Sequence, residues 1–286
     1  MNRRVAALVA VLLALVAVAC KGAGADPGGG PGPTPTRKPP AELPNSMAAL
    51  GDSITAGVGS CLTLTACPRN SWATGDGTLV NSHYRRILAA NPAIRGHAAN
   101  LAVPGATVSD LPAQAAAAVG QRPDYVTILI GANDACRPTI DQMTTKADFQ
   151  AQLRSALTTL RSGLPRARVL LVSVPDVYQV WEAAHTRRAA QEVWALGVCQ
   201  SLLANPTSTA PADVARRQRF RDQIEVYDSV LAAVCKEYGP RCRYDATVHG
   251  TPFGIAQLSL LDYFHPNSEG QAQLANLTYP GSFTWG

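Results

Sequence analysis

The stretch "AALGDSITAGVGS" (residues 48–60) starts as a small apolar run and breaks into Gly51, Asp52 and Ser53. An apolar run that ends in a glycine and two polar residues is typical of a buried strand followed by a sharp turn. A serine at this position can form a turn, cap a helix or act as a nucleophile. The role of Ser53 therefore depends on which other residues the fold brings to the same place.

Apolar runs alternate with helical patterns along the rest of the chain. We expect strands at 47–50, 98–103, 125–130, 169–174 and 243–245, and helices at 82–90, 109–119, 149–161, 180–203, 212–237 and 268–276. Short buried strands between amphipathic helices favour a central parallel sheet that is covered on both faces. The sequence thus predicts one α/β domain over residues 47–286, in which ligands gather at the carboxyl ends of the strands.

Two more of these strands run into turns with polar or glycine residues. The second leads into "VPGATVSD" (103–110), which contains Gly105, and the third leads into "GANDAC" (131–136), which contains Asn133. The backbone N–H groups of Ser53 and Gly105 and the side-chain amide of Asn133 are donors of the kind that stabilise an oxyanion in acyl transfer. Each has an ordinary alternative, because Gly105 also fits a simple turn and Asn133 also fits a helix cap.

A serine nucleophile needs a base, and the base needs a group that orients it. The segment "LDYFHPNSEGQ" (261–271) offers both, because Asp262 and His265 are three residues apart. Asp262 can accept the Nδ1–H of His265, which leaves Nε2 free to take the proton of Ser53. The other histidines lack a carboxylate at such spacing and are expected to be structural or at the surface: His83, His97, His185 and His249.

Together, "GDSITAG", "VPGATVSD", "GANDAC" and "DYFHP" resemble the four blocks of the SGNH (GDSL-type) hydrolases, in the same order. Ile54 stands where the family name has a leucine. The resemblance implies a three-layer, flavodoxin-like α/β fold with a central parallel sheet and no cofactor or metal. It also implies that Ser53 is the nucleophile, His265 the base and Asp262 its orienting partner, with Ser53, Gly105 and Asn133 forming the oxyanion hole.

The resemblance predicts a serine esterase or lipase that acts on acyl esters. "SWATGDG" (71–77) and the neighbouring blocks look most like the phospholipase B-like branch, which favours a lipid or lysophospholipid substrate. Two other functions stay open. One is a carbohydrate O-acetyl esterase, and the other is a non-catalytic surface-binding lipoprotein that has kept the fold.

The N-terminus predicts export. Arg3 and Arg4 precede an unbroken apolar run over residues 5–19, which is typical of a signal peptide and short for a membrane anchor. "AVAC" (17–20) resembles the lipobox of bacterial lipoproteins, so Cys20 is expected to carry a diacylglycerol. An ordinary signal peptide cleaved nearby remains the alternative. Either outcome places the protein outside the cytoplasm, as a membrane lipoprotein or in secreted form.

Residues 20–46 are expected to form a disordered linker. Six glycines and seven prolines occur among residues 21–46, without apolar periodicity. An extended tether of this length would span up to roughly 80 Å, at ~3.1 Å per residue.

With Cys20 set aside for the lipid, six cysteines remain, and an even number in an exported chain indicates disulfides. Cys61–Cys67 and Cys235–Cys242 are close enough in sequence to close local loops, which leaves Cys136–Cys199. Fifteen pairings are possible for six cysteines, so this connectivity is a hypothesis.

Composition excludes some functions. The chain of 286 residues is 47% hydrophobic, enough for a sizeable core, and its formal charge is +5. The basic residues are dispersed, so nothing indicates a nucleic-acid partner. There is no P-loop, dinucleotide-binding glycine motif or zinc motif, and we expect a monomer with a small-molecule or lipid ester as its partner.

Overall fold

The computed structural model describes residues 42–286. The predicted signal peptide at 1–19, the lipidation site Cys20 and nearly all of the linker at 20–46 lie outside these residues. The order of strands in the sheet is β2-β1-β3-β4-β5, and all neighbouring strands are parallel. The strands are β1 (Met47–Gly51), β2 (Ala98–Asn100), β3 (Tyr125–Leu129), β4 (Arg168–Val172) and β5 (Cys242–Asp245).

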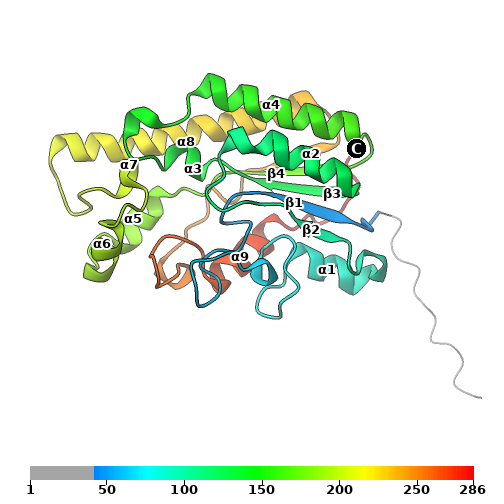
Figure 1. The fold of residues 1–286 in the computed structure, drawn as a ribbon, viewed down its shortest axis with the longest axis horizontal. Helices are drawn as coiled ribbons and strands as arrows, with labels where there is room; N and C mark the ends of the chain where they lie inside the picture. Colours follow the sequence, from blue (N-terminus) through cyan, green and yellow to red (C-terminus); the bar gives the residue numbers. More distant parts are fainter. Residues whose placement is uncertain (1–41) are drawn as a thin grey trace, which may run out of the picture. The chain divides into compact units, whose positions relative to one another are not determined.

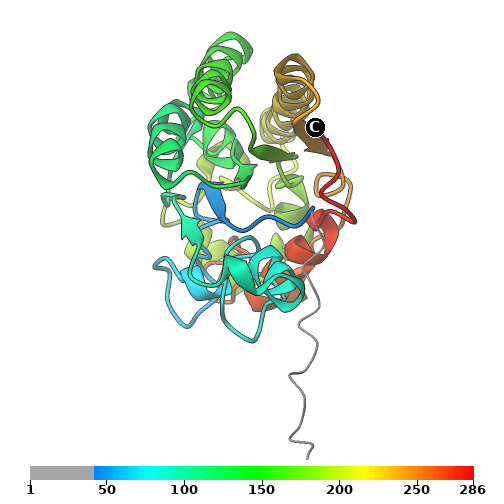
Figure 2. The ribbon, with the colours of Figure 1, turned by 90° about the vertical axis from the view of Figure 1, so that its right-hand side faces the viewer.

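Helices cover both faces of the sheet, as the alternation of elements in the sequence predicted (Figures 1 and 2). They are α1 (His83–Ala90), α2 (Leu111–Gln121), α3 (Ala132–Ala135), α4 (Lys146–Gly163), α5 (Tyr178–Ala184), α6 (Arg188–Trp194), α7 (Gln200–Leu203), α8 (Pro211–Tyr238) and α9 (Ser268–Thr278). In Figure 1, α2, α4 and α8 lie above the sheet, whereas α1 and α9 lie below it. The three-layer, flavodoxin-like fold is therefore confirmed.

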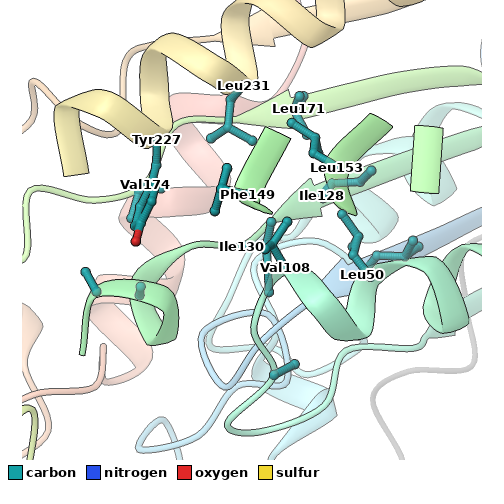
Figure 3. Close-up of a cluster of buried hydrophobic side chains, with 14 of the residues drawn as sticks. Leu50, Val108, Ile128, Ile130, Phe149, Leu153, Leu171, Val174, Tyr227 and Leu231 are labelled. Carbon is teal, nitrogen blue, oxygen red and sulfur yellow. The ribbon is translucent and has the colours of Figure 1, made fainter. Parts of the chain in front are cut away.

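The two faces of the sheet carry separate cores, because successive side chains of a strand point to opposite sides. Leu50, Ile128 and Leu171 belong to the larger core, where they face Phe149 of α4 and Tyr227 of α8 (Figure 3). The intervening residues of the strands enter a second core together with α1 and α9. Burial on both faces explains why the strands read as almost continuous apolar runs.

One expected helix is wrong. The prediction of a continuous helix over 180–203 fails, because the chain forms α5, α6 and α7 with breaks between them. Gly197 has a φ of +109° and Cys199 a φ of +42°, values that a right-handed helix does not allow. The amphipathic pattern survives as three short pieces that pack against the larger core.

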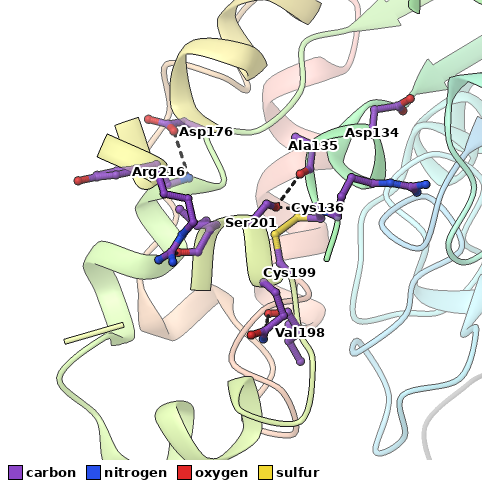
Figure 4. The surroundings of a disulfide bond; sticks show 12 residues. Asp134, Ala135, Cys136, Asp176, Val198, Cys199, Ser201 and Arg216 are labelled. Atoms are coloured by element: carbon purple, nitrogen blue, oxygen red, sulfur yellow. Dashed lines mark hydrogen bonds between the residues drawn. A yellow bond between two sulfur atoms is a disulfide. The ribbon is translucent and has the colours of Figure 1, made fainter. Parts of the chain in front are cut away.

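The three disulfides join Cys61 to Cys67, Cys136 to Cys199 and Cys235 to Cys242, the same pairs that the sequence suggested. Cys136 directly follows α3, so its bridge ties the end of α3 to the start of α7 (Figure 4). The hydroxyl of Ser201 donates to the carbonyl of Ala135 at 2.7 Å and strengthens the same junction. Disulfides of this number are typical of proteins that fold outside the cytoplasm.

Candidate active site

The turn after β1 depends on a glycine. Gly51 has a φ of +144°, and a Cβ at this position would lie 2.2 Å from the carbonyl oxygen of Leu129. Gln114 of α2 holds the turn from the other side: its amide donates to the Gly51 carbonyl at 2.9 Å and accepts the Gly51 N–H at 2.8 Å. Strand β1 therefore ends abruptly, and Ser53 follows at the carboxyl edge of the sheet.

The carboxyl edge is also where the order of strands reverses. Strands β2 and β3 lie on either side of β1, so the turns after all three strands meet at one switch point. In open α/β sheets this position is where ligands bind. Ser53 follows β1, Gly105 follows β2 and Asn133 follows β3, so all three predicted strand-end residues belong to this edge.

Ser53, His265 and Asp262 form one hydrogen-bonded line. The Nε2 atom of His265 lies 2.9 Å from Ser53 Oγ, and its Nδ1 atom lies 2.5 Å from Asp262 Oδ2. Because an ionised carboxylate can only accept, Nδ1 carries the hydrogen and Nε2 is free to accept from the serine hydroxyl. Asp262 is almost fully buried, while 19% of the His265 side chain is exposed.

The segment around the histidine is folded to present this pair. The second carboxylate oxygen of Asp262 accepts the N–H groups of Phe264, at 3.0 Å, and His265, at 3.1 Å. Tyr263 adopts a φ of +52°, which reverses the chain within the turn. Asn267 then caps α9 by accepting the N–H groups of its first turn. Hydrogen bonds to the backbone therefore hold the Asp262 side chain in place before His265 and the start of α9 in place after it.

The loops with Gly105 and Asn133 are joined to each other. The side-chain amide of Asn133 donates to the Ala106 carbonyl at 2.9 Å, and the N–H of Val108 donates to Asp134 at 2.9 Å. Gly105 has a φ of +82°. Within residues 42–286, the backbone N–H groups of Ser53 and Gly105 find no protein acceptor, so both donors remain available.

An apolar pocket of about 40 Å³ adjoins the serine. Ser53, His265 and Asp176 supply its polar wall, and Ala132, the neighbour of Asn133, also lines it. The apolar wall is made by residues that sequence reasoning did not identify, among them Ile54, Val180, Phe253, Phe264 and Leu274. Their positions along the chain are scattered, so no local pattern could have revealed them.

Two buried carboxylates stand behind the site, and the sequence analysis assigned a role to neither. Asp52 is fully buried, and burial raises its pKa to about 7 although the Ile54 N–H and the nearby His265 act against this shift. Its Oδ2 atom has no hydrogen-bond partner among residues 42–286. Burial also raises the pKa of Asp134, to about 6. Their position next to Ser53 and Asn133 in the sequence was the available signal.

A second histidine–carboxylate contact was also missed. The Nδ1 atom of His249 lies 3.0 Å from Asp228 of α8, 21 positions away along the chain. The hydrogen bond to Asp228 raises the pKa of His249. The backbone N–H of His249 donates to Ser173 Oγ, and the ring Nδ1 also lies 3.1 Å from the Val174 carbonyl oxygen. This contact joins α8 to the loop after β5, and within residues 42–286 the His249 ring makes no hydrogen bond to a serine hydroxyl.

The part of the chain that the structure describes contains no group of three or more His, Cys, Asp and Glu side chains placed to hold a metal ion. None of its helices is long and apolar enough to cross a membrane.

The fold and its carboxyl edge define an α/β protein whose strands β1, β2 and β3 end at the switch point where such sheets bind ligands. Comparisons with known proteins identify the family. The model of the GDSL-like lipase/acylhydrolase family matches residues 49–273, so the chain belongs to this family. The matched segment extends from β1 into α9 and includes all four sequence blocks. No curated protein matches the chain.

Several solved structures are similar to it. An extracellular lipase from Streptomyces rimosus is 19% identical, with 82% of this chain and 99% of that chain covered and a TM-score of 0.48. A phospholipase A1 from Streptomyces albidoflavus is 17% identical, with coverages of 82% and 98% and a TM-score of 0.47. A family 3 carbohydrate esterase from Clostridium thermocellum is 13% identical, with coverages of 82% and 92% and a TM-score of 0.48.

Proposed function

We propose that this protein hydrolyses acyl esters through a Ser53–His265–Asp262 triad. The observation that carries the proposal is the line of short contacts from Asp262 through His265 to Ser53 Oγ. Ser53 Oγ attacks the ester carbonyl carbon while His265 Nε2 takes the serine proton. The tetrahedral intermediate collapses, the alkoxide leaves with that proton, and an acyl-enzyme remains. Water, deprotonated by His265, then releases the acid.

The developing oxyanion would be bound by the N–H groups of Ser53 and Gly105 and by the amide of Asn133. Two observations support this assignment: the two N–H groups have no acceptor among residues 42–286, and Asn133 is joined to the Gly105 loop by its hydrogen bond to Ala106. The Asn133 amide would have to turn from Ala106 toward the substrate or share its two hydrogens between them. Such donors stabilise the transition state more than the ester ground state.

An acyl ester of a lipid or lysophospholipid is the favoured substrate, on the strength of the sequence resemblance. The small pocket beside Ser53 supports a second candidate, a carbohydrate O-acetyl esterase, because about 40 Å³ suits an acetyl group better than a long chain. We further propose that the chain is exported and lipidated at Cys20. Mass spectrometry of the mature N-terminus, with Cys20→Ala as the control, tests this part.

A fluorophosphonate probe tests the catalytic proposal, because it reacts covalently with an activated serine. We expect labelling of the wild type and none of Ser53→Ala. Ser173→Ala is a matched control, since Ser173 is a buried serine that lies beside the other histidine–carboxylate pair. The Ser173→Ala variant should be labelled like the wild type. A folded wild type that takes no label at Ser53 would favour the non-catalytic surface-binding lipoprotein.

A panel of esters from acetyl to long acyl, with lysophosphatidylcholine included, separates the two substrate classes. Preference for long chains or for the lysolipid supports the lipid assignment. Activity confined to acetyl esters supports the acetyl esterase.

A further inference from the structure

Exposed apolar side chains gather on the loops around the catalytic edge. Among residues 42–286, eight large apolar side chains are strongly exposed, and six of them lie on these loops. The six are Leu62, Leu64, Leu79, Val103, Leu260 and Leu261. Single exposed apolar side chains are ordinary, but a concentration of them in one region usually marks an interaction surface.

Four of these leucines line one groove of about 880 Å³. We call this surface the leucine groove, and its four exposed leucines are Leu62, Leu79, Leu260 and Leu261. The three loops that carry them lie near α9 in Figure 1. Arg69 is the only side chain in the lining that carries a charge, and it makes no ion pair among the described residues.

The leucine groove borders the catalytic residues directly. Leu261 precedes Asp262 in the chain, and Leu258 lines both the groove and the pocket that contains Ser53. Gly59, in the groove wall, has a φ of +79° and approaches so closely that a Cβ there would lie 2.8 Å from the Cβ of His265. A molecule held in the groove is therefore adjacent to the proposed site of hydrolysis.

A disulfide and a hydrogen bond constrain the loop that carries Leu62. Leu62, which is 97% exposed, lies in the loop closed by the Cys61–Cys67 disulfide. The side-chain amide of Asn70 donates to the Ser60 carbonyl at 2.8 Å and fastens the base of this loop. A loop so constrained cannot fold its leucine back onto the protein, so the apolar surface stays available to a partner.

We propose that the leucine groove docks the enzyme on a lipid surface, with the leucines inserted below the headgroups and Arg69 beside the lipid phosphates. The leucines project from three separate loops, which suits a fluid interface, whereas protein partners require closely packed complementary surfaces. The chain before residue 42 leads back to the proposed lipid anchor at Cys20, and residues 21–41 would span up to roughly 65 Å at ~3.1 Å per residue, which allows the groove to reach that membrane. The inference rests on the proposed function for what happens after docking.

Vesicle binding tests the docking surface. The probe is a vesicle of phosphatidylcholine mixed with phosphatidylglycerol, and the exported chain carries Cys20→Ala so that no attached lipid contributes. We expect the double variant Leu62→Ser, Leu260→Ser to lower the partition coefficient by about tenfold or more, because leucine gains much from leaving water. Hydrolysis of vesicle lipid should fall far more than hydrolysis of a water-soluble acetyl ester.

Leu196→Ser is the matched control, because Leu196 is 85% exposed and does not line the leucine groove. It should bind vesicles like the parent. Equal vesicle binding by the double variant and the parent, or no binding by the parent, overturns the proposal. A dimer that dissociates in the double variant would instead identify the groove as an interface between copies of the chain and would also overturn it.

Different results would contradict the proposed catalytic function and the docking proposal. Ser53→Ala should retain full vesicle binding, and a parent protein that binds vesicles but hydrolyses no ester would contradict the catalytic assignment alone.

Discussion

Two histidines of this protein each use both ring nitrogens in hydrogen bonds, yet their surroundings differ completely. His265 contacts a carboxylate and a serine hydroxyl, and part of its ring reaches solvent. His83, the first residue of α1, is fully buried, with Tyr125 Oη at 3.0 Å and Thr278 Oγ1 at 2.9 Å. A count of hydrogen bonds would not distinguish them.

The difference lies in charge and access. Burial lowers the pKa of His83 to about 3, with the charge of Arg86 adding to the shift, so this ring stays neutral and serves as a structural link between α1, β3 and α9. His265 instead contacts a carboxylate, and in the proposed mechanism Asp262 stabilises the imidazolium that forms during proton transfer. A carboxylate partner and an open face therefore distinguish the proposed base His265 from the structural His83, and both roles can be tested.

The largest expected effect is on turnover. Ser53→Ala and His265→Ala should each reduce kcat by on the order of 10⁴–10⁶, and the double variant should be scarcely worse, because the two residues act as a unit. The measurement is hydrolysis of a water-soluble acetyl ester, with urea unfolding to verify that each variant folds. His83→Gln should keep turnover within a few-fold of the wild type. Near-normal turnover in Ser53→Ala would end the triad assignment.

The next largest effect is a pH dependence of the stability that His83 should cause. Its folded-state pKa lies below the ordinary value of 6.5, so the folded protein rejects a proton that the unfolded chain accepts. Stability is therefore present above pH 6.5 and falls as the pH drops toward 3, by at most about 5 kcal/mol.

Urea unfolding as a function of pH measures this slope. His83→Gln should flatten it, because glutamine does not titrate, whereas His97→Gln, at an exposed position, should leave it unchanged. An identical acid slope in wild type and His83→Gln would show that other groups cause it.

Asp52 should also make the stability depend on pH, but in the opposite direction from His83. Its pKa is raised to about 7, so the folded state holds a proton that the unfolded chain has lost above pH 4. Stability is fully present below that pH and declines as the pH rises through 7, by at most about 4 kcal/mol. Asp52→Asn keeps an oxygen to accept the Ile54 N–H and removes the titration.

Unfolding free energies at pH 5 and pH 8 provide the test. The difference between the two pH values should shrink in Asp52→Asn and stay as in the wild type in Asp76→Asn, whose side chain is exposed. A variant that loses stability equally at both pH values would mean that Asp52 is ionised in the folded protein.

Much of the fold was readable from the sequence because buried strands and their turns are local features. The predicted strands at 47–50 and 125–130 agree with β1 and β3 to within a residue, and Ser53 and Asn133 follow them. The Asp262–His265 contact was also readable, since three residues of spacing suffice for it. Where one residue type and its neighbours determine the geometry, the prediction holds.

The remaining features depend on residues that are distant along the chain. The helix expected over 180–203 breaks at 185–187 and at 195–199. The second break lies where Cys199 is tied to Cys136, a constraint that hydrophobic periodicity does not contain. Ser53 and His265 are 212 residues apart, so their contact followed from a family resemblance and not from spacing. The burial of Asp52 and the walls of the small pocket arise from packing between elements, which no single segment encodes.

The smallest of these effects extends the comparison to the oxyanion. Asn133→Ala should lower kcat by on the order of 10²–10³, about 3 kcal/mol, since it removes one donor that is stronger in the transition state than in the ground state. KM should change little, because the donor acts on charge that the bound ester does not yet carry.

Asn133 also holds the Gly105 loop through Ala106, so a purely structural loss must be separated from a catalytic one. Asn276→Ala, at an exposed position on α9 where the amide oxygen accepts from Arg86, is the matched control and should leave both constants unchanged. If Asn133→Ala raises KM and lowers the unfolding free energy while kcat stays normal, Asn133 positions the loop and the oxyanion is bound by Ser53 and Gly105 alone.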